Sequence, residues 1–296
     1  MGLIVGGLFY AVGLNQRSVQ DRTGALYFVL TSQIFSAQAS MRVFLEERDL
    51  FLRERIAGTY RTSAYFWSKS IADTPLQLLF ALVFSLVSYY FVGLQPTFMH
   101  VFIYCLTIVI TTLAAESYVI MIGAWVPDDK TAAILGPVAF ALMSLFGGFF
   151  LNIDSLPFFV AWLQYLSLFK YSFAAIMQNE FQGLKFTCDE EDSRAWLETL
   201  DESTRGHVEE FLHLLPCPTP DGETHLHRLK LDQIGVWPCI GVLIVMGIMF
   251  RVLGFVALRR RSNKLMTGLQ QRQRKCPVLP RNRGMKKPAN HPTKQD

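Results

Sequence analysis

An acid inside a long uncharged stretch is the first residue of this sequence that could do chemistry. Glu116 interrupts the segment 98–125, which has no other charged residue. Because an unpaired charge at membrane depth is costly, such an acid marks a functional site by default, as a proton site or a substrate contact. We expect instead a structural carboxyl that is protonated and hydrogen-bonded to Thr111, Thr112 or Ser117, since that arrangement costs least.

A second acid, Asp73, lies one turn inside the segment 71–92, just before Pro75. Lys69 precedes it by four residues, the spacing that brings two side chains together on one helical face. We therefore predict an Asp73–Lys69 ion pair near the membrane interface rather than a transport role.

A charged segment at 46–55 alternates acids and bases around three apolar residues at 50–52. It reads as an amphipathic helix that ends at Gly58, because glycine commonly breaks a helix. Two interpretations remain open from the residues alone. The segment is either a solvated loop with basic residues beside the membrane or a docking helix that contacts a cytoplasmic partner.

Cysteine and histidine residues offer little catalytic chemistry. Cys188 and Cys217 lie in a strongly acidic segment, and we predict a disulfide between them, the alternatives being two free thiols or a bond to a partner chain. Without a CxxC pair, no metal site is predicted. His225 and His227 lack further ligands at metal-binding spacing, so we interpret them as surface residues.

Motifs for nucleotide hydrolysis are missing from the sequence. It contains no G-x-x-x-x-G-K-[ST] phosphate loop, no nucleophile elbow and no kinase motif set. We predict no cofactor for this chain and no enzymatic activity of the chain alone.

The elements that must position these residues are membrane helices. Hydrophobic residues make up 51% of the 296 residues and charged residues only 18%, against about 25% in soluble domains. Apolar runs with at most one charged residue each, at 25–41, 71–92, 98–125, 131–151 and 233–258, predict five full spans, and the run at 2–14 predicts a partial one. Helices are expected because backbone groups in lipid must be paired within the segment.

Charge predicts the orientation of these spans. Residues 42–69 carry six basic and four acidic residues, and the tail from Arg259 carries twelve basic residues and one acid, so both are expected in the cytoplasm. Residues 188–232 carry twelve acids and four bases and are expected outside. The tail 262–296 contains four prolines and is predicted to be disordered, contacting anionic lipid rather than nucleic acid.

The aromatic segment 153–181 follows a full span without a charged loop. If it crossed the membrane, the acidic loop would lie in the cytoplasm, so we predict a re-entrant or interfacial helical pair on the outer face. At its entrance, Gly147 and Gly148 precede Phe149 and Phe150. Small residues favour close helix packing, whereas the two rings would form a constriction if this helix lines a pathway.

The order of these features resembles the transmembrane domain of an ABCG-type (White subfamily) ABC half-transporter. The resemblance rests on Phe51-Leu52-Arg53-Glu54-Arg55 with Gly58-x-Tyr60-Arg61, on Lys69-x-x-x-Asp73-x-Pro75, on Gly147-Gly148-Phe149-Phe150-Leu151-Asn152, on Asn179-Glu180-Phe181-Gln182-Gly183-Leu184 and on Phe250-Arg251-Val252-Leu253. It covers about residues 1–261. It implies an all-α polytopic membrane protein with a six-helix ABC exporter-type transmembrane domain, a truncated first helix, a re-entrant segment and an extracellular loop at about 178–232.

The resemblance also implies roles for individual residues. Glu47, Arg53 and Glu54 would belong to a coupling helix that contacts a nucleotide-binding domain. The substrate cavity would be lined by Phe35, Phe140 and Ala141, and Phe149 and Phe150 match an apolar plug above it. Cys188 and Cys217 match loop cysteines that form a disulfide.

The partners implied are a second half-transporter, as a homodimer or heterodimer, a nucleotide-binding domain that binds ATP and Mg²⁺, and membrane lipids. The family exports lipids, sterols and other amphipathic substrates. Because a nucleotide-binding domain is absent from the sequence, we expect a fragment or a split transporter. The alternatives are a non-transporting dimerisation partner or truncated regulator, and a secondary transporter with Glu116 as its ion site.

Overall fold

The structure is a computed structural model that describes residues 7, 9, 12–150, 162–186 and 221–275. Its elements are α2 (Gln16–Ser36), α3 (Gln38–Ile56), α4 (Thr62–Val92), α5 (Phe98–Trp125), α6 (Asp129–Leu145), the 3₁₀ helix η2 (Trp162–Leu166), α8 (Leu168–Phe181), α11 (Gly222–Arg228) and α12 (Val236–Lys275). The fold is all-α, as the sequence predicted.

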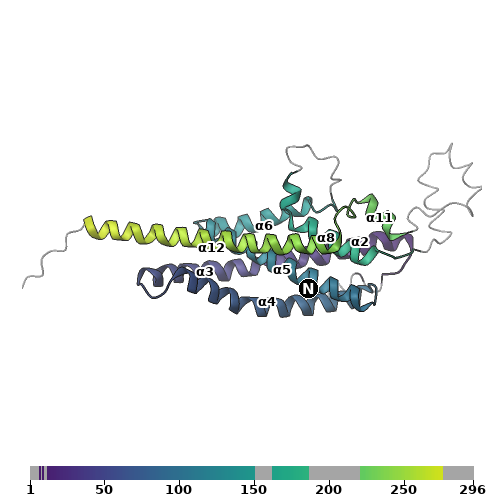
Figure 1. The fold of residues 1–296 in the computed structure, drawn as a ribbon, viewed down its shortest axis with the longest axis horizontal. Helices are drawn as coiled ribbons and strands as arrows, with labels where there is room; N and C mark the ends of the chain where they lie inside the picture. Colours follow the sequence, from purple (N-terminus) through teal and green to yellow (C-terminus); the bar gives the residue numbers. More distant parts are fainter. Residues whose placement is uncertain (1–6, 8, 10–11, 151–161, 187–220, 276–296) are drawn as a thin grey trace, which may run out of the picture.

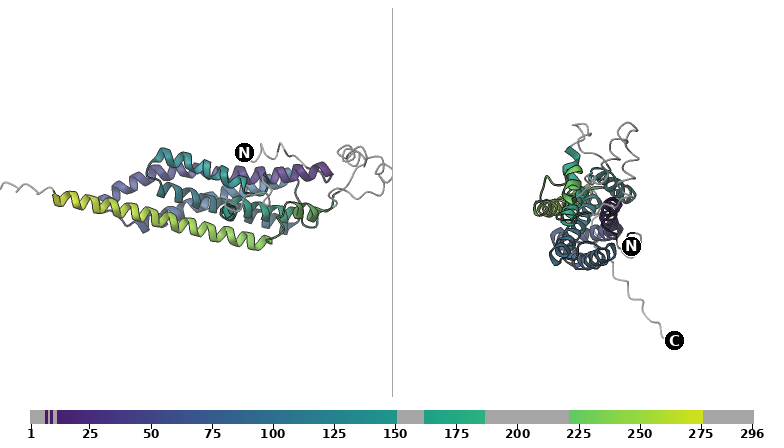
Figure 2. Two further views of the ribbon diagram at one scale, coloured as in Figure 1. Left: turned by 90° about the horizontal axis from the view of Figure 1, so that it is seen from above. Right: turned by 90° about the vertical axis from the view of Figure 1, so that its right-hand side faces the viewer.

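The long helices lie side by side along one axis, as both views of Figure 2 show. The α3–α4 turn and the C-terminal part of α12 lie at one end of the bundle, which we call the basic end (Figure 1). The α4–α5 turn, α8 and α11 lie at the other end, which we call the cap end. The charge pattern of the sequence assigned these segments to opposite faces of a membrane, and the fold separates them accordingly.

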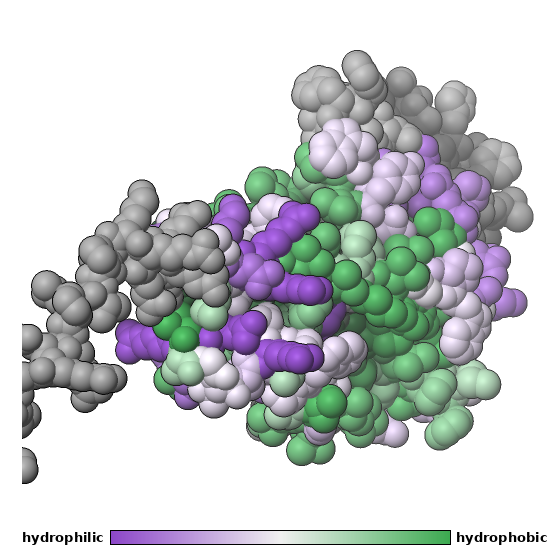
Figure 3. Space-filling view, turned by 60° about the vertical axis from the view of Figure 1, so that its left-hand side comes forward, coloured by the Kyte–Doolittle hydropathy of each residue, from purple (hydrophilic) through white to green (hydrophobic). Residues whose placement is uncertain are grey.

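Helix α5 is the centre of the bundle and packs against α3, α4, α8 and α12. Three of the described helices, α4, α5 and α12, are long and apolar enough to cross a membrane. The space-filling view shows hydrophobic surface between hydrophilic side chains at the two ends (Figure 3). This pattern is typical of a protein whose middle faces lipid.

The predicted span 25–41 is divided in the structure. Helix α2 ends at Ser36, the backbone turns at Ala37, and α3 continues to Ile56. The charged segment 46–55 is therefore the second half of α3, rather than a separate short helix.

Helix ends coincide with residues that favour termination or capping. Gly93 ends α4 in the left-handed region, with φ of 72°. Asp128 caps α6 by accepting a hydrogen bond from the Thr131 amide at 3.0 Å. Pro127 stands between α5 and α6, where it prevents the two helices from joining because proline lacks an amide donor.

One segment differs from its sequence prediction. Helix α12 continues to Lys275, beyond residue 261 where the ordered domain was expected to end. The residues 262–275 are rich in good helix formers, and the first proline follows only at 277. Helix α8, from the aromatic segment, is buried on every side except at Lys170. It packs among α2, α5 and α12, which cover its side chains.

Candidate functional site

The first group of predicted site residues lies where α2 meets α6. The ring of Phe35 meets the ring of Phe140 edge to face, with centroids 6.0 Å apart, and Phe140 stacks on Tyr118 at 5.3 Å. Phe140 is fully buried, whereas Phe35 is half-buried and Ala141 is exposed. The expectation that Phe140 lines a cavity is therefore corrected: its ring supports Phe35 from behind, and Phe35 and Ala141 present the surface.

The predicted plug residues join an aromatic cluster near the C-terminal end of α6. Tyr27 stacks on Phe149 with centroids 4.4 Å apart and meets Phe150 and Phe173 edge to face. The Tyr27 hydroxyl also donates to the Ser144 carbonyl at 3.0 Å. Phe149 is thereby anchored to α2, while Phe150 leaves 59% of its surface exposed. Phe149 thus packs against the core, whereas the ring of Phe150 faces outward.

At the basic end, Lys69 of α4 binds two acids. It pairs with Asp73 at 2.9 Å, which confirms the predicted ion pair, and it also pairs with Glu47 of α3. The second contact joins the charged half of α3 to α4. Sequence spacing could predict the pair four residues apart, but not the one between two helices.

The two other residues assigned to the coupling helix differ in their surroundings. Arg53 is exposed, whereas Glu54 accepts a hydrogen bond from the Tyr60 hydroxyl at 2.5 Å. Burial raises the pKa of Tyr60 to about 12, and the Glu54 carboxylate adds to the shift, so the phenol stays protonated and donates at neutral pH. Glu54 therefore stabilises the α3–α4 turn, and Arg53 is the residue that faces outward.

Glu116 lies 1% exposed beside a groove between α4, α5 and α12. Neither of its oxygens accepts a hydrogen bond within the described part of the chain, because Thr112 and Ser117 donate to backbone carbonyls of α5 instead. The expected hydroxyl-bonded carboxyl is therefore wrong. The nearest cation is the Arg251 guanidinium, 4.0 Å away on α12.

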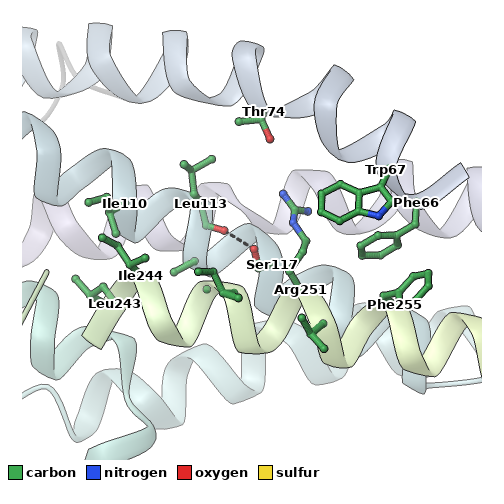
Figure 4. A pocket seen from close by; sticks show the side chains of 14 residues that line it. Phe66, Trp67, Thr74, Ile110, Leu113, Ser117, Leu243, Ile244, Arg251 and Phe255 are labelled. Carbon is green, nitrogen blue, oxygen red and sulfur yellow. Dashed lines mark hydrogen bonds between the residues drawn. The ribbon is translucent and has the colours of Figure 1, made fainter. Parts of the chain in front are cut away.

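The groove itself has a volume of about 460 Å³. Arg251 reaches from α12 toward α4 and lies beside Trp67, while the walls are formed largely by apolar side chains such as Ile110 and Ile244 (Figure 4). The signal for Arg251 was visible in the sequence as the one charged residue within the run 233–258. Its partner on α5 could not be known without the fold.

A buried ion pair at the cap end was not predicted at all. Arg22 of α2 pairs with Glu180 of α8, and both side chains are almost fully buried. The same guanidinium donates to the carbonyls of Val12 at 2.8 Å and Gly93 at 3.2 Å. The Gln95 amide donates to Glu180 at 3.2 Å. This network ties α2, α8 and the α4–α5 turn together.

The prediction that His225 is a surface residue is wrong. Its ring lies 3.0 Å from the Thr23 hydroxyl and packs against the Phe181 ring, so it is part of the contact between α11 and the bundle rather than a surface residue. His227 is exposed, as predicted. The predicted disulfide residues Cys188 and Cys217 lie outside the described residues.

Known proteins with similar sequences identify the family of this chain. Residues 1–181 match the family model of the ABC-2 type transporter. The bovine broad substrate specificity ATP-binding cassette transporter ABCG2 is 34% identical over 187 residues, which are 63% of this chain and 28% of that protein. ABC transporter G family member 1 of Dictyostelium discoideum is 29% identical over 270 residues, covering 88% of this chain and 31% of the relative.

A plant relative, ABC transporter G family member 16 of Arabidopsis thaliana, is 28% identical over 269 residues, covering 87% of this chain and 36% of its own length. The chain thus spans about a third of the length of these relatives. The similarity covers the helices that carry the aromatic cluster and the charged half of α3. The chain belongs to the ABC-2 type transporter family of membrane domains and is homologous to the ABCG transporters.

Proposed function

We propose that this chain is the membrane-spanning subunit of an ATP-driven exporter. It would pair with a second half-transporter and with a nucleotide-binding domain that binds ATP and Mg²⁺. It would move lipids, sterols or other amphipathic molecules through a cavity at the dimer interface. Family membership supports the transporter role, and the bovine relative's name, which includes broad substrate specificity, supports an apolar, permissive path.

The observation that carries the proposal is the surface formed by α2 and α6. Phe35 stands half-exposed beside the exposed Ala141, with Phe140 holding its ring in position. Helix α6 also exposes Ile134, Val138 and Leu142. An apolar face of this kind suits both a second half-transporter and an amphipathic substrate, because neither requires fixed polar partners.

The basic end would face the cytoplasm, since lysine and arginine accumulate on that side of membrane proteins. The coupling role would then fall to the charged half of α3. Arg53 is exposed there and free to contact a nucleotide-binding domain, while Glu54 supports the turn through Tyr60. Glu47 connects the same helix to Lys69 of α4.

Substitution of Phe35 tests the cavity. The chain is assembled with a nucleotide-binding subunit in proteoliposomes, and uptake of a panel of lipids, sterols and amphipathic dyes is measured with ATP. Phe35→Ala is expected to change the ratio of transport rates between substrates by about tenfold, because a ring contact contributes about 1 kcal/mol or more. The variant should remain folded. Phe80→Ala, which removes an exposed ring from α4, is the matched control.

Unaltered transport of the whole panel by Phe35→Ala would contradict the cavity role. If the wild-type assembly moved no substrate but altered the activity of a full-length homologue, the chain would be a dimerisation partner or regulator instead.

Substitution of Glu54 tests coupling. In the same assembly, Glu54→Ala is expected to keep ATP hydrolysis while reducing substrate moved per ATP, because the α3–α4 turn loses its Tyr60 contact. Tyr60→Phe removes the same hydrogen bond from the other side and should reproduce the defect. Normal substrate-stimulated hydrolysis and transport in both variants would remove Glu54 from the coupling mechanism.

A further inference from the structure

The most deeply buried charge of the basic end is an arginine that no predicted role uses. Arg48 lies on α3, one residue after Glu47, and its side chain is 1% exposed. Arg53 on the same helix is exposed. Burying a guanidinium destabilises the fold unless hydrogen-bond acceptors compensate for the lost water. The acceptors of Arg48 therefore indicate its structural role.

Those partners are mainly backbone carbonyls at the end of α5. Arg48 Nη1 donates to Gly123 at 2.5 Å and to Val126 at 3.0 Å, and Nη2 lies 3.4 Å from the Pro127 carbonyl. The last carbonyls of a helix have no partner within the helix and carry its negative dipole end. The guanidinium therefore caps α5 at the turn that leads into α6.

The same guanidinium reaches α6 directly. Arg48 Nη2 pairs with Asp129, the first residue of α6, whose side chain is about half exposed. A second arginine, Arg261 of α12, donates to the carbonyls of Val126 at 3.2 Å and Pro127 at 3.1 Å. The α5–α6 turn is thus held by guanidinium groups from two different helices.

Close packing reinforces the contact between α3 and its neighbours. A Cβ at Gly136 of α6 would lie 2.6 Å from the Gln38 amide oxygen and 3.1 Å from the Met41 methyl group of α3, so both side chains would have to shift. A side chain at Gly123 of α5 would collide with Phe44 of α3 at 2.8 Å. Helix α3 therefore lies directly on α5 and α6 and is joined to α6 by a charged contact at its buried face.

We propose that Arg48 is a positioning residue that makes α3 and α6 move together, so that displacement of the charged half of α3 reaches the α6 segment bearing Ala141. The inference rests on the proposed function for its consequence, because only a transporter needs this movement. The mechanical link itself is a property of the chain alone. It can therefore be tested without transport.

The first test measures the link in the chain reconstituted into lipid nanodiscs. Spin labels introduced by bioorthogonal chemistry at the exposed positions Val43 on α3 and Ile134 on α6 leave the five native cysteines untouched. Arg48→Met is expected to broaden the distance distribution between the labels, and Arg48→Lys to broaden it less, because lysine keeps the charge but loses the planar fork. Arg53→Met is the control and should match the wild type.

A distribution in folded Arg48→Met as narrow as that of the wild type would overturn the proposal. If Arg48→Met does not fold, Asp129→Asn gives the answer instead, because it removes the charged contact to α6 and leaves the carbonyl contacts of Arg48 in place. Broadening in Asp129→Asn would support the link, and an unchanged distribution would overturn it.

The second test measures substrate moved per ATP in the assembled transporter. Arg48→Met is expected to lower this ratio about tenfold, as for the loss of a charge-assisted hydrogen bond, with hydrolysis retained. Arg48→Lys should recover part of the loss. An unchanged ratio in a transporting assembly would overturn the role of Arg48. A wild-type assembly that moves nothing would instead contradict the proposed function, and the nanodisc measurement would still decide the link.

Discussion

The cap end and the basic end of the bundle are both held by arginines, but their charges are paired in different ways. At the cap end, Arg22 and Glu180 are both almost fully buried, and backbone groups complete the network. At the basic end, the carboxylates that pair with the buried cations are half exposed, as with Asp129 and with Glu47. A fully buried pair locks an arrangement, whereas a pair that reaches solvent can be exchanged at little cost. The cap end is therefore the more firmly fixed end, whereas the charge pairs of the basic end can be exchanged for contacts with a partner.

Breaking the buried pair should have the largest effect. Arg22→Met leaves the Glu180 carboxylate buried without its cation, which is expected to cost about 3–5 kcal/mol of stability. The measurement is the temperature at which the detergent-solubilised protein loses its monodisperse size-exclusion peak. The double variant Arg22→Met with Glu180→Met should recover most of the loss, because no charge remains buried.

If Arg22→Met proved as stable as the wild type, or if the double variant were as unstable as the single one, the cap end would not owe its rigidity to this pair.

Breaking the exposed pair should have a smaller effect. Lys69→Met removes the contacts to Glu47 and Asp73, whose side chains are 43% and 36% exposed. Since solvent can replace the lost cation, we expect a loss of only about 0–1 kcal/mol in the same thermal assay. A loss as large as that of Arg22→Met would show that the basic end is locked as firmly as the cap end.

Mild acidification should have the smallest effect, and we expect it at the cap end. Burial lowers the pKa of His225, and the nearby Arg228 charge adds to the shift, so the folded protein binds this proton more weakly than the unfolded chain does. The stability from the neutral ring is therefore present above the unfolded pKa of about 6.5 and is lost as the pH falls through the lower folded pKa.

Hydrogen exchange of the α11 amides, corrected for intrinsic rates, measures this change in the intact protein. Protection is expected to fall on acidification in the wild type and to be independent of pH in His225→Gln. His227→Gln is the control, because that ring is exposed. A wild-type profile that does not change between neutral and mildly acidic pH would contradict a buried neutral His225.

The helical architecture was largely predictable because its signals are local. Long apolar runs marked α4, α5 and α12, and the four-residue spacing of Lys69 and Asp73 predicted their contact. The end of α12 was misjudged because the prolines of the tail were taken to indicate disorder from residue 262, although the first of them is at 277 and helix propensity prevails before it. Phe140 was misjudged because a residue next to an exposed position on a helix need not share its face.

The amino-acid sequence by itself determined that this is a membrane protein, where its long apolar helices α4, α5 and α12 lie and which charged segments share an end of the bundle. These properties depend on hydrophobicity and charge within single segments. Only the tertiary structure decided the partners of the buried charges. Arg22 meets Glu180 across 158 residues and Arg48 meets Asp129 across 81, and no local periodicity relates residues so far apart. Those pairings follow from how the helices pack. A buried guanidinium is stable only when it is hydrogen-bonded, and helix packing decides which acceptors lie within reach.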